Sequence, residues 1–351
     1  MMTTKATDPT GAALALAQES VAARATALDE VRTDVRPDLA GLGGAGLFDA
    51  ALEEGGLPSL VHVIDTIAAQ SLAVGFSAWA HAMTLLYLQR ASDPLRDEYV
   101  DALRSGSRLG VTAMAPGLKQ LAGLGDMPLI ADKSGGMLRI TGLIPWASNL
   151  FHDALIVLPA RSISGDTYVV AVDADAPGVT INPAPALMAL GATASTSVHL
   201  QNVDVPNTHI ISLDLGEFVK RVRPMLLLLQ TAFALGVGRA SLDAARHFTG
   251  PLTAPFADDL TALSSQMAKL GDLLYALSGE PSQRPIKDMV QLRLDTSTAA
   301  VAATRLEFTL AGATGYRSGT ATNRRFREAA FLPIQAPSEG QLRRELQQFD
   351  Q

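Results

Sequence analysis

The sequence predicts an α+β protein with an N-terminal helical domain at residues 12–108, a middle antiparallel β-barrel domain at residues 109–212 and a C-terminal helical bundle at residues 213–351. The first and last regions place apolar residues three and four apart, which is helical spacing. The middle region instead holds short β-branched runs between turn sequences. A block of strands between two blocks of helices favours separate helical and β domains over a doubly wound parallel sheet.

The N-terminal domain is expected to be entirely helical. It is rich in Ala, Leu, Glu and Arg, and these residues include the strongest helix formers. Pro58 and Ser59 precede Leu60, Val61 and Ile64, so we expect a loop and a helix cap that lead into a core-facing helix.

The β domain is marked by β-branched and apolar runs at residues 138–141, 154–158 and 168–172. Turn sequences containing Gly, Pro, Ser or Asp separate these runs, at residues 134–136, 164–166 and 176–178. Short strands joined by such turns are typical of a small antiparallel domain.

The longest apolar stretch lies at residues 225–238, is about 14 residues long and is broken by Gln230. A bilayer-spanning helix needs roughly 20 residues, so we expect a buried helix in a soluble protein. Residues 225–235 are apolar on every side of a helix, which predicts burial on both sides.

Composition excludes several functional classes. Apolar residues make up 48% of the 351 residues, which excludes disordered and fibrous proteins. The net charge of −7 argues against a general nucleic-acid-binding role, which needs an excess of basic residues. The chain has no Cys, so disulfides, thiolate metal sites and a Cys nucleophile are impossible. The six His residues lack metal-ligand spacing, and His152 in the β domain could approach a ligand there, although a single residue is a weak signal. No secretory signal precedes the first helix, so a cytoplasmic location is expected.

Two glycine clusters invite a nucleotide-binding interpretation. Residues 41–46 are G-L-G-G-A-G and residues 236–238 are G-V-G. A dinucleotide fingerprint needs a strand before it and a helix that opens at it, whereas the first cluster follows a predicted helix and the second lies inside one. A turn and a tight helix–helix contact are therefore favoured.

Basic side chains gather near the C-terminus, at Arg324, Arg325, Arg327, Arg343 and Arg344. They fit a solvated helical face balanced by the glutamates at positions 328, 339 and 345. They also fit an anion site for a cofactor phosphate, because a guanidinium group donates bidentate hydrogen bonds.

An ordered set of short motifs over residues 37–344 resembles the acyl-CoA dehydrogenase superfamily. The motifs are G-L-F at 46–48 with glycines at 55 and 56, D-P-L-R-D-E-Y at 93–99 with a glycine at 106, G-L-I-P-W-A-S-N at 142–149, P-G-V at 177–179, L-G at 190–191, N-V-D-V-P at 202–206, and R-P at 223–224 with a glycine at 236. Each motif is weak alone, whereas their order and spacing together are specific. The resemblance implies the helical, β-barrel and helical domains that the pattern predicts independently.

The resemblance also implies FAD as the cofactor of a flavin-dependent oxidoreductase. A flavin ring has a polar edge and an apolar face, so its site needs backbone groups, small hydroxyls and an aromatic wall. By correspondence with the family, Leu109, Val111 and Thr112 belong to the segment at the pyrimidine edge, Trp146 covers the ring, and Ser148 faces the N5 side.

The sequence offers few candidate catalytic residues, because it departs from the family pattern at the expected positions. The family's acidic T-E-P-x-x-G-S-D segment is T-A-M-A-P-G-L-K at 112–119, and its Y-E-G-T base segment is Q-A-P-S at 335–338, so Ala336 stands where the carboxylate is expected. An alanine cannot replace a general base, which contributes roughly 10²–10⁴ in rate. Glu339 could substitute only if the loop were rearranged. Arg223 is the one catalytic candidate, and a simple helix-start charge explains it equally well.

Two further departures concern cofactor binding. The usual Lys of the tryptophan segment is Ile144, and residues 247–251 lack the motif that holds the flavin pyrophosphate of a neighbouring subunit. We therefore expect FAD to be bound weakly, or to be supplied in reduced form.

Three functions remain open at this point. The first is a dehydrogenase-like flavoenzyme that oxidises an acyl thioester or a related small molecule, and the second is a two-component flavin monooxygenase, whose flavin needs a dry pocket and no family base. The third is a non-catalytic chain that pairs with an intact homologue. The resemblance further implies a homo-oligomer, a dimer or a tetramer, assembled through the last domain.

Overall fold

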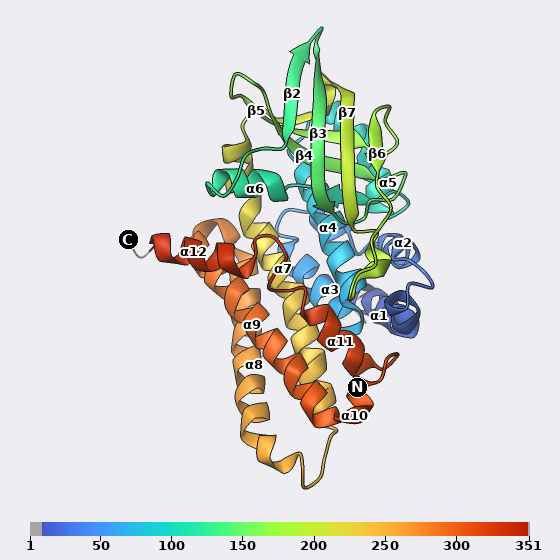
Figure 1. Ribbon diagram of the computed structural model, residues 1–351, viewed down its shortest axis with the longest axis vertical. Helices are drawn as coiled ribbons and strands as arrows, with labels where there is room; N and C mark the ends of the chain where they lie inside the picture. The colour runs from blue at the N-terminus through green and yellow to red at the C-terminus, as the bar shows by residue number, and fades with distance from the viewer. Residues whose placement is uncertain (1–8, 350–351) are drawn as a thin grey trace, which may run out of the picture.

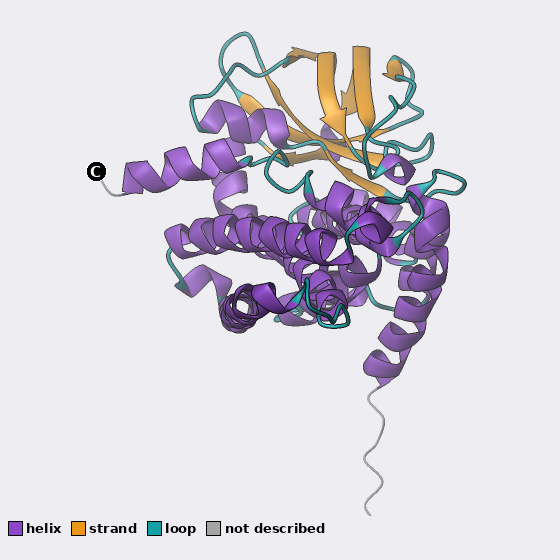
Figure 2. Cartoon of the chain, turned by 60° about the horizontal axis from the view of Figure 1, so that its bottom comes forward, coloured by secondary structure: helices purple, strands orange, loops and turns teal. Residues whose placement is uncertain are grey.

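The computed structural model describes residues 9–349, and its strands lie at one end of an elongated helical body (Figure 1). Figure 2 shows the strands gathered on one side and the helices on the other. The N-terminal helices are α1 (Pro9–Asp29), α2 (Arg36–Gly44), α3 (Leu57–Gln70), α4 (Leu72–Leu88) and α5 (Asp93–Arg104). The C-terminal helices are α7 (Leu215–Ala245), α8 (Ala257–Gly279), α9 (Ile286–Ala311), α10 (Ala313–Tyr316), α11 (Ala321–Ala329) and α12 (Glu339–Phe349).

Within the described residues, eight strands form one mixed sheet in the middle of the chain. They are β1 (Gly110–Thr112), β2 (Leu129–Ser134), β3 (Met137–Ala147), β4 (Leu155–Arg161), β5 (Thr167–Asp173), β6 (Val179–Ile181), β7 (Thr196–Pro206) and β8 (Ile210–Ser212), with the short helix α6 (Ala115–Leu121) after β1. Most neighbouring strands are antiparallel, as the turn-rich sequence predicts. β1 and β2 instead pair with β4 in parallel, so the sheet is mixed rather than purely antiparallel.

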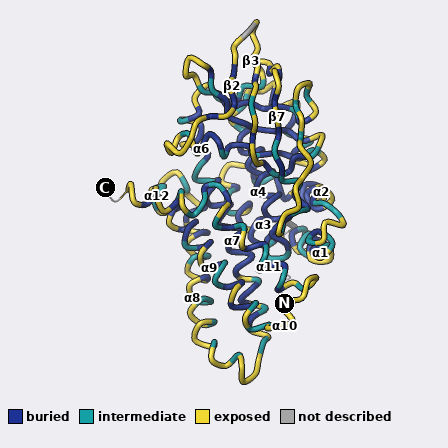
Figure 3. Tube along the Cα trace, viewed as in Figure 1, coloured by how far each residue is buried: buried dark blue, intermediate teal, exposed yellow. Residues whose placement is uncertain are grey.

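Helix α4 is the central element between the β domain and the helical body. All of its residues are buried, because it packs against α3, α5, α7 and β1 at once (Figure 3). Ser71 caps its first turn through Oγ, which accepts a hydrogen bond from the backbone N–H of Val74. A helix that is apolar on every side, as this one is, belongs inside a large core.

Helix α7 explains the long apolar stretch. It begins at the cap Asp214, whose carboxylate accepts a hydrogen bond from the N–H of Glu217, and residues 226–238 are all buried. By length and composition it could cross a membrane, but most of its apolar window is buried inside the chain. The expected burial on both sides is therefore supplied by α3, α4, α8 and α9 of the same chain, and no second subunit is required for it.

The glycine clusters make close backbone contacts, as the sequence favoured. A Cβ on Gly236 would lie 2.2 Å from the carbonyl oxygen of Asp65, so α3 and α7 can approach closely only because this residue is glycine. A Cβ on Gly43 would lie 2.3 Å from the backbone of Ser105. Both positions serve packing.

The two halves of the basic segment differ: Arg343 of α12 pairs with Glu339 on an exposed helical face, as the sequence predicted, whereas Arg324 and Arg325 of α11 contradict both interpretations. Arg324 and Arg325 are buried rather than solvated. Arg325 Nε donates to Glu307 Oε2 at 2.9 Å, and Arg324 Nη2 donates to the carbonyl of Gln70 at 2.8 Å. These guanidinium groups hold α11 to α9 and α3, so they are engaged inside the fold and do not form a free anion site.

Candidate active site

A cavity of about 550 Å³ lies where α4, the β domain and the segment after α11 meet. Its walls come from α4, from residues 112–119 around the start of α6, from the end of β3, from the loop at residues 187–195 and from residues 327–341. This volume is within the range of small-molecule and cofactor sites. The cavity is larger than an adjoining cavity of about 190 Å³ that shares part of its wall.

The structure brings three of the predicted ring-binding residues to this cavity. Thr112, Trp146 and Ser148 line it, and Trp146 keeps 57% of its surface exposed. Leu109 and Val111 do not line it, because their side chains are buried in the core behind β1. Contact with a cofactor through these side chains is therefore confined to the first three, and their flavin-binding role stays a prediction.

Strand β1, which carries Thr112, is held by hydrogen bonds to both backbone groups of its first residue, Gly110. The backbone N–H of Gly110 donates to His81 Nδ1 at 3.0 Å, and Asn149 Nδ2 donates to the carbonyl of Gly110 at 3.1 Å. His81 Nε2 lies 2.8 Å from the carbonyl of Leu103, so this nitrogen carries the ring proton. Complete burial lowers the pKa of His81 to about 4, which keeps the ring neutral.

A chain of hydroxyl groups leads from the cavity wall into the loop before β7. Ser148 Oγ lies 2.6 Å from Ser195 Oγ, which lies 2.6 Å from Thr193 Oγ1, and Thr193 donates to the carbonyl of Leu190 at 2.8 Å. A carbonyl can only accept, so each hydroxyl in turn donates to the next. The Ser148 hydroxyl therefore donates its hydrogen bond to Ser195 and presents only lone pairs to the cavity.

The opposite wall carries the segment where the family base is expected. Ala336 lines the cavity, and its carbonyl accepts a hydrogen bond from Gln230 Nε2 at 3.0 Å. Gln335, Ser338 and Gln341 line it as well, whereas none of the described residues around it is Asp or Glu.

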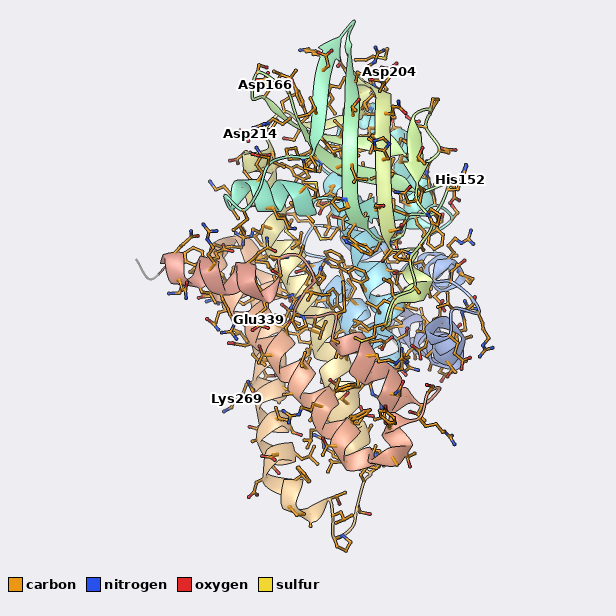
Figure 4. The ribbon with its side chains drawn as sticks, in the orientation of Figure 1. His152, Asp166, Asp204, Asp214, Lys269 and Glu339 are labelled. Carbon is orange, nitrogen blue, oxygen red and sulfur yellow. The ribbon has the colours of Figure 1, made fainter. Side chains whose placement is uncertain are left out.

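Glu339 does not replace the missing carboxylate. Its Oε1 accepts a hydrogen bond from Arg343 Nε at 2.7 Å, and the residue is not part of the cavity wall. Figure 4 labels it near the start of α12.

Sequence reasoning missed the aromatic floor of the cavity. Phe76 and Trp79 of α4 stack at 5.4 Å between ring centroids, and Phe76 meets Phe331 edge-on at 4.9 Å. The sequence does place two aromatic residues three positions apart, but the same spacing occurs on the buried face of any core helix, so it does not indicate a cavity. Trp79 Nε1 is buried and has no hydrogen-bond partner within residues 9–349.

The other candidates lie outside the main cavity. Arg223 faces an adjoining cavity of about 190 Å³ and forms an ion pair with Glu345, so its catalytic role stays a prediction and its observed partner is structural. Figure 4 places His152 at the outer edge of the β domain, and it does not line the main cavity. Residues 247–251 lie beyond the end of α7, at the tip of the bundle far from the sheet (Figure 1).

Comparisons with known proteins agree with this architecture. No family model matches the sequence. The chain is 26% identical over 274 residues to benzylmalonyl-CoA dehydrogenase of Aromatoleum aromaticum, which covers 74% of this chain and 71% of that protein. Butyryl-CoA dehydrogenase from Megasphaera elsdenii superimposes with a TM-score of 0.86 at 17% identity, covering 99% of each chain. A glutaryl-CoA dehydrogenase from Mycobacterium smegmatis in complex with FADH₂ superimposes with a TM-score of 0.85 at 17% identity, covering 97% of this chain and 94% of that one.

The helical, β and helical regions, with a cavity at their junction, define a protein of the acyl-CoA dehydrogenase fold. This agrees with the fold that the ordered motifs predicted, and the sequence is similar to that of a dehydrogenase named for a substrate of this type, benzylmalonyl-CoA dehydrogenase.

Proposed function

We propose that this chain is an FAD-dependent oxidoreductase of the dehydrogenase type that oxidises the acyl group of a thioester. The observation that carries the proposal is the shared cavity, in which Thr112, Trp146 and Ser148 of the β domain face Ala336 at the position of the family base. The named relatives are dehydrogenases of CoA thioesters, which favours dehydrogenation over oxygenation and over a non-catalytic role.

The residues around the cavity fit a flavin ring. Trp146 and Leu118 supply apolar surface, Thr112 and Ser148 supply hydroxyl groups, and the buried Trp79 Nε1 is a donor without a protein partner. Such a mixture of apolar walls and few polar groups is what a flat heteroaromatic ring requires. FAD, when bound, supplies the hydride acceptor of the reaction.

Each side chain then has a limited task. Trp146 supplies an apolar aromatic wall against which a flat ring can pack. Ser148 accepts a hydrogen bond from whatever N–H group faces it, because its own proton is committed to Ser195. Gln230 holds the backbone of Ala336 and so sets the position of the neighbouring wall.

No carboxylate is present among the described lining residues, so the rate of acyl-CoA oxidation is expected to be low. A positioned general base contributes roughly 10²–10⁴, so oxidation of a plain acyl-CoA by this chain is expected to be slower by that factor than in a chain that carries Glu at position 336.

The first experiment titrates the purified protein with FAD and follows the quenching of flavin fluorescence. We expect saturable binding, and Trp146→Ala should weaken it by about tenfold through loss of a large apolar contact. Leu143→Ala is the matched control, because Leu143 is an exposed apolar residue of the same strand outside the cavity wall. The FAD-loaded protein should lose its visible absorption when butyryl-CoA is added without oxygen. No FAD binding at high concentration, or binding that Trp146→Ala leaves unchanged, would refute the proposal.

The family resemblance also supports assembly through the C-terminal domain, and we propose a homodimer or a dimer of dimers in the cytoplasm. Light scattering at micromolar concentration tests the assembly, and a strictly monomeric mass would contradict it.

A further inference from the structure

Arg293 is a buried cation without a counter-ion directly behind the cavity wall. It belongs to α9 and is 1% exposed. Among residues 9–349 no carboxylate pairs with it. Its guanidinium group instead donates to Gln335 Oε1 at 2.9 Å, to Gln230 Oε1 at 3.3 Å and to the carbonyl of Leu332 at 3.3 Å, with Ser297 as a further partner.

The charge of Arg293 persists at neutral pH. Burial lowers its pKa to about 10, which still leaves the guanidinium group protonated. A cation in a low-dielectric interior acts over longer distances than one in water, because little solvent screens it. Its hydrogen-bond partners are all neutral oxygens, so its positive charge is spread over them and not cancelled.

This cation decides which way the amide of Gln335 points. A guanidinium group can only donate, so the amide oxygen must face Arg293 and the amide nitrogen must face away from it. Gln335 lines the cavity, and its Nε2 makes no hydrogen bond within the described residues. The side chain therefore offers a polarised N–H donor at the position next to Ala336.

The same cation also fixes the segment that carries this donor. Arg293 holds the oxygen of Gln230, which turns Gln230 Nε2 toward the carbonyl of Ala336 at 3.0 Å. One arginine thus orients two glutamine side chains: Gln335, which lines the cavity, and Gln230, which holds the carbonyl of Ala336.

The charged residues of the cavity wall have the same sign. Lys119 and Arg327 line the cavity, and no Asp or Glu among the described residues does so. Arg327 is already paired with Asp29 at 2.5 Å, whereas the buried charge of Arg293 has no such partner. A negative ligand group would therefore enter a site whose fixed charges favour it.

We propose that Gln335, oriented by Arg293, binds a carboxylate on the acyl group of the substrate. The aromatic floor of Phe76, Trp79 and Phe331 would take the apolar part of the same acyl group. This inference rests on the proposed function for the identity of the ligand as an acyl compound. Gln335 is a binding residue in this scheme and Arg293 is a positioning residue.

The test compares two ligands of nearly the same shape, the anion 3-phenylpropanoate and the neutral 3-phenylpropanamide. Their affinities for the FAD-saturated protein are measured by titration calorimetry and again without added FAD. The chain has two tryptophans, Trp79 and Trp146, and both line the cavity, so tryptophan fluorescence without FAD confirms where the ligand binds. We expect the carboxylate to bind about tenfold more tightly, the effect of one charge-assisted hydrogen bond.

Gln335→Met should remove the preference to within about twofold while leaving the affinity for the amide unchanged. Gln335→Glu should weaken the carboxylate further, because a second negative charge then occupies the site. Gln341→Met is the matched control: Gln341 also lines the cavity, but its oxygen is held by the neutral N–H of Ser338, so this variant should keep the preference. Arg293→Lys keeps the charge without the planar fork and should retain only part of the preference.

Equal affinities of the wild-type protein for the two ligands would overturn the inference. So would a Gln335→Met variant that weakens both ligands equally, since that result assigns Gln335 to packing or to carbonyl binding. Failure to bind FAD refutes the proposed function but leaves the charge preference measurable in the titration without FAD. The two failures are therefore distinguishable.

Discussion

The buried ring of His81 holds Gly110 by accepting the hydrogen bond of its backbone N–H at Nδ1, 3.0 Å away. This bond links α4 to the strand that carries Thr112 into the cavity. It exists only while Nδ1 is unprotonated, so the stability of the fold is tied to the pKa of His81.

His81 should make the protein less stable in mild acid. Its pKa is about 4 in the folded chain against an ordinary value of 6.5. Between pH 6.5 and pH 4 the unfolded chain therefore binds a proton at this residue that the folded chain does not bind. Stability is therefore complete above pH 6.5 and falls as pH drops toward 4, by about 2 kcal/mol between pH 7 and pH 5. Urea unfolding at the two pH values measures this loss, and His81→Asn should reduce it. An equal loss in the variant would assign the effect to other groups.

Ala336→Glu should increase the rate of acyl-CoA oxidation. Ala336 lines the cavity at the position of the family base, so a carboxylate there can reach a substrate proton. We expect anaerobic reduction of bound FAD by butyryl-CoA to accelerate by about 10²-fold or more, the effect of a general base. Ala336→Gln adds a side chain of the same size without basicity and should not accelerate it. Equal rates in both variants would show that the loop does not present residue 336 to the substrate.

Ser195→Ala should lower the reduction potential of the bound flavin. With Ser195 present, Ser148 can only accept a hydrogen bond, which suits the N–H of a reduced ring on the side that the family resemblance assigns to Ser148. Removing Ser195 frees the proton of Ser148 to bond the oxidised ring instead. A change of about 1 kcal/mol corresponds to roughly 20 mV in a two-electron couple. Potentiometric titration measures the shift, with Ser197→Ala, two residues further on in β7, as the control, and a rise in potential would contradict the assigned direction of the hydroxyl chain.

Arg223→Gln and Glu345→Gln should destabilise the fold by similar amounts. The two side chains form an ion pair between α7 and α12 and are 24% and 21% exposed, so removal of either leaves a partly buried charge without its partner. The double variant should be no less stable than either single one, with a coupling energy of about 1 kcal/mol in thermal unfolding. Turnover that falls in Arg223→Gln but not in Glu345→Gln would instead support the catalytic role considered for Arg223.

Local patterns in the sequence were enough to predict the order of helical and β regions, and the ordered motifs were enough to predict the acyl-CoA dehydrogenase fold. Periodicity reports which face of an element is buried over a few turns, and motif spacing reports short loops, so both are visible without the fold. The same reasoning brought Thr112, Trp146 and Ser148 to one cavity, because they lie on segments that the family motifs identify.

The tertiary structure decided what those patterns could not contain. Arg293 and Gln335 lie 42 positions apart in the sequence, and Gln230 and Ala336 lie 106 apart, so no local sequence pattern indicates that they pair. Charged residues near the C-terminus became buried partners of distant groups, and the apolar α7 was covered by its own chain. The physical reason is that a buried polar group must find its partner wherever the packed helices place one, and that choice is made by the whole core.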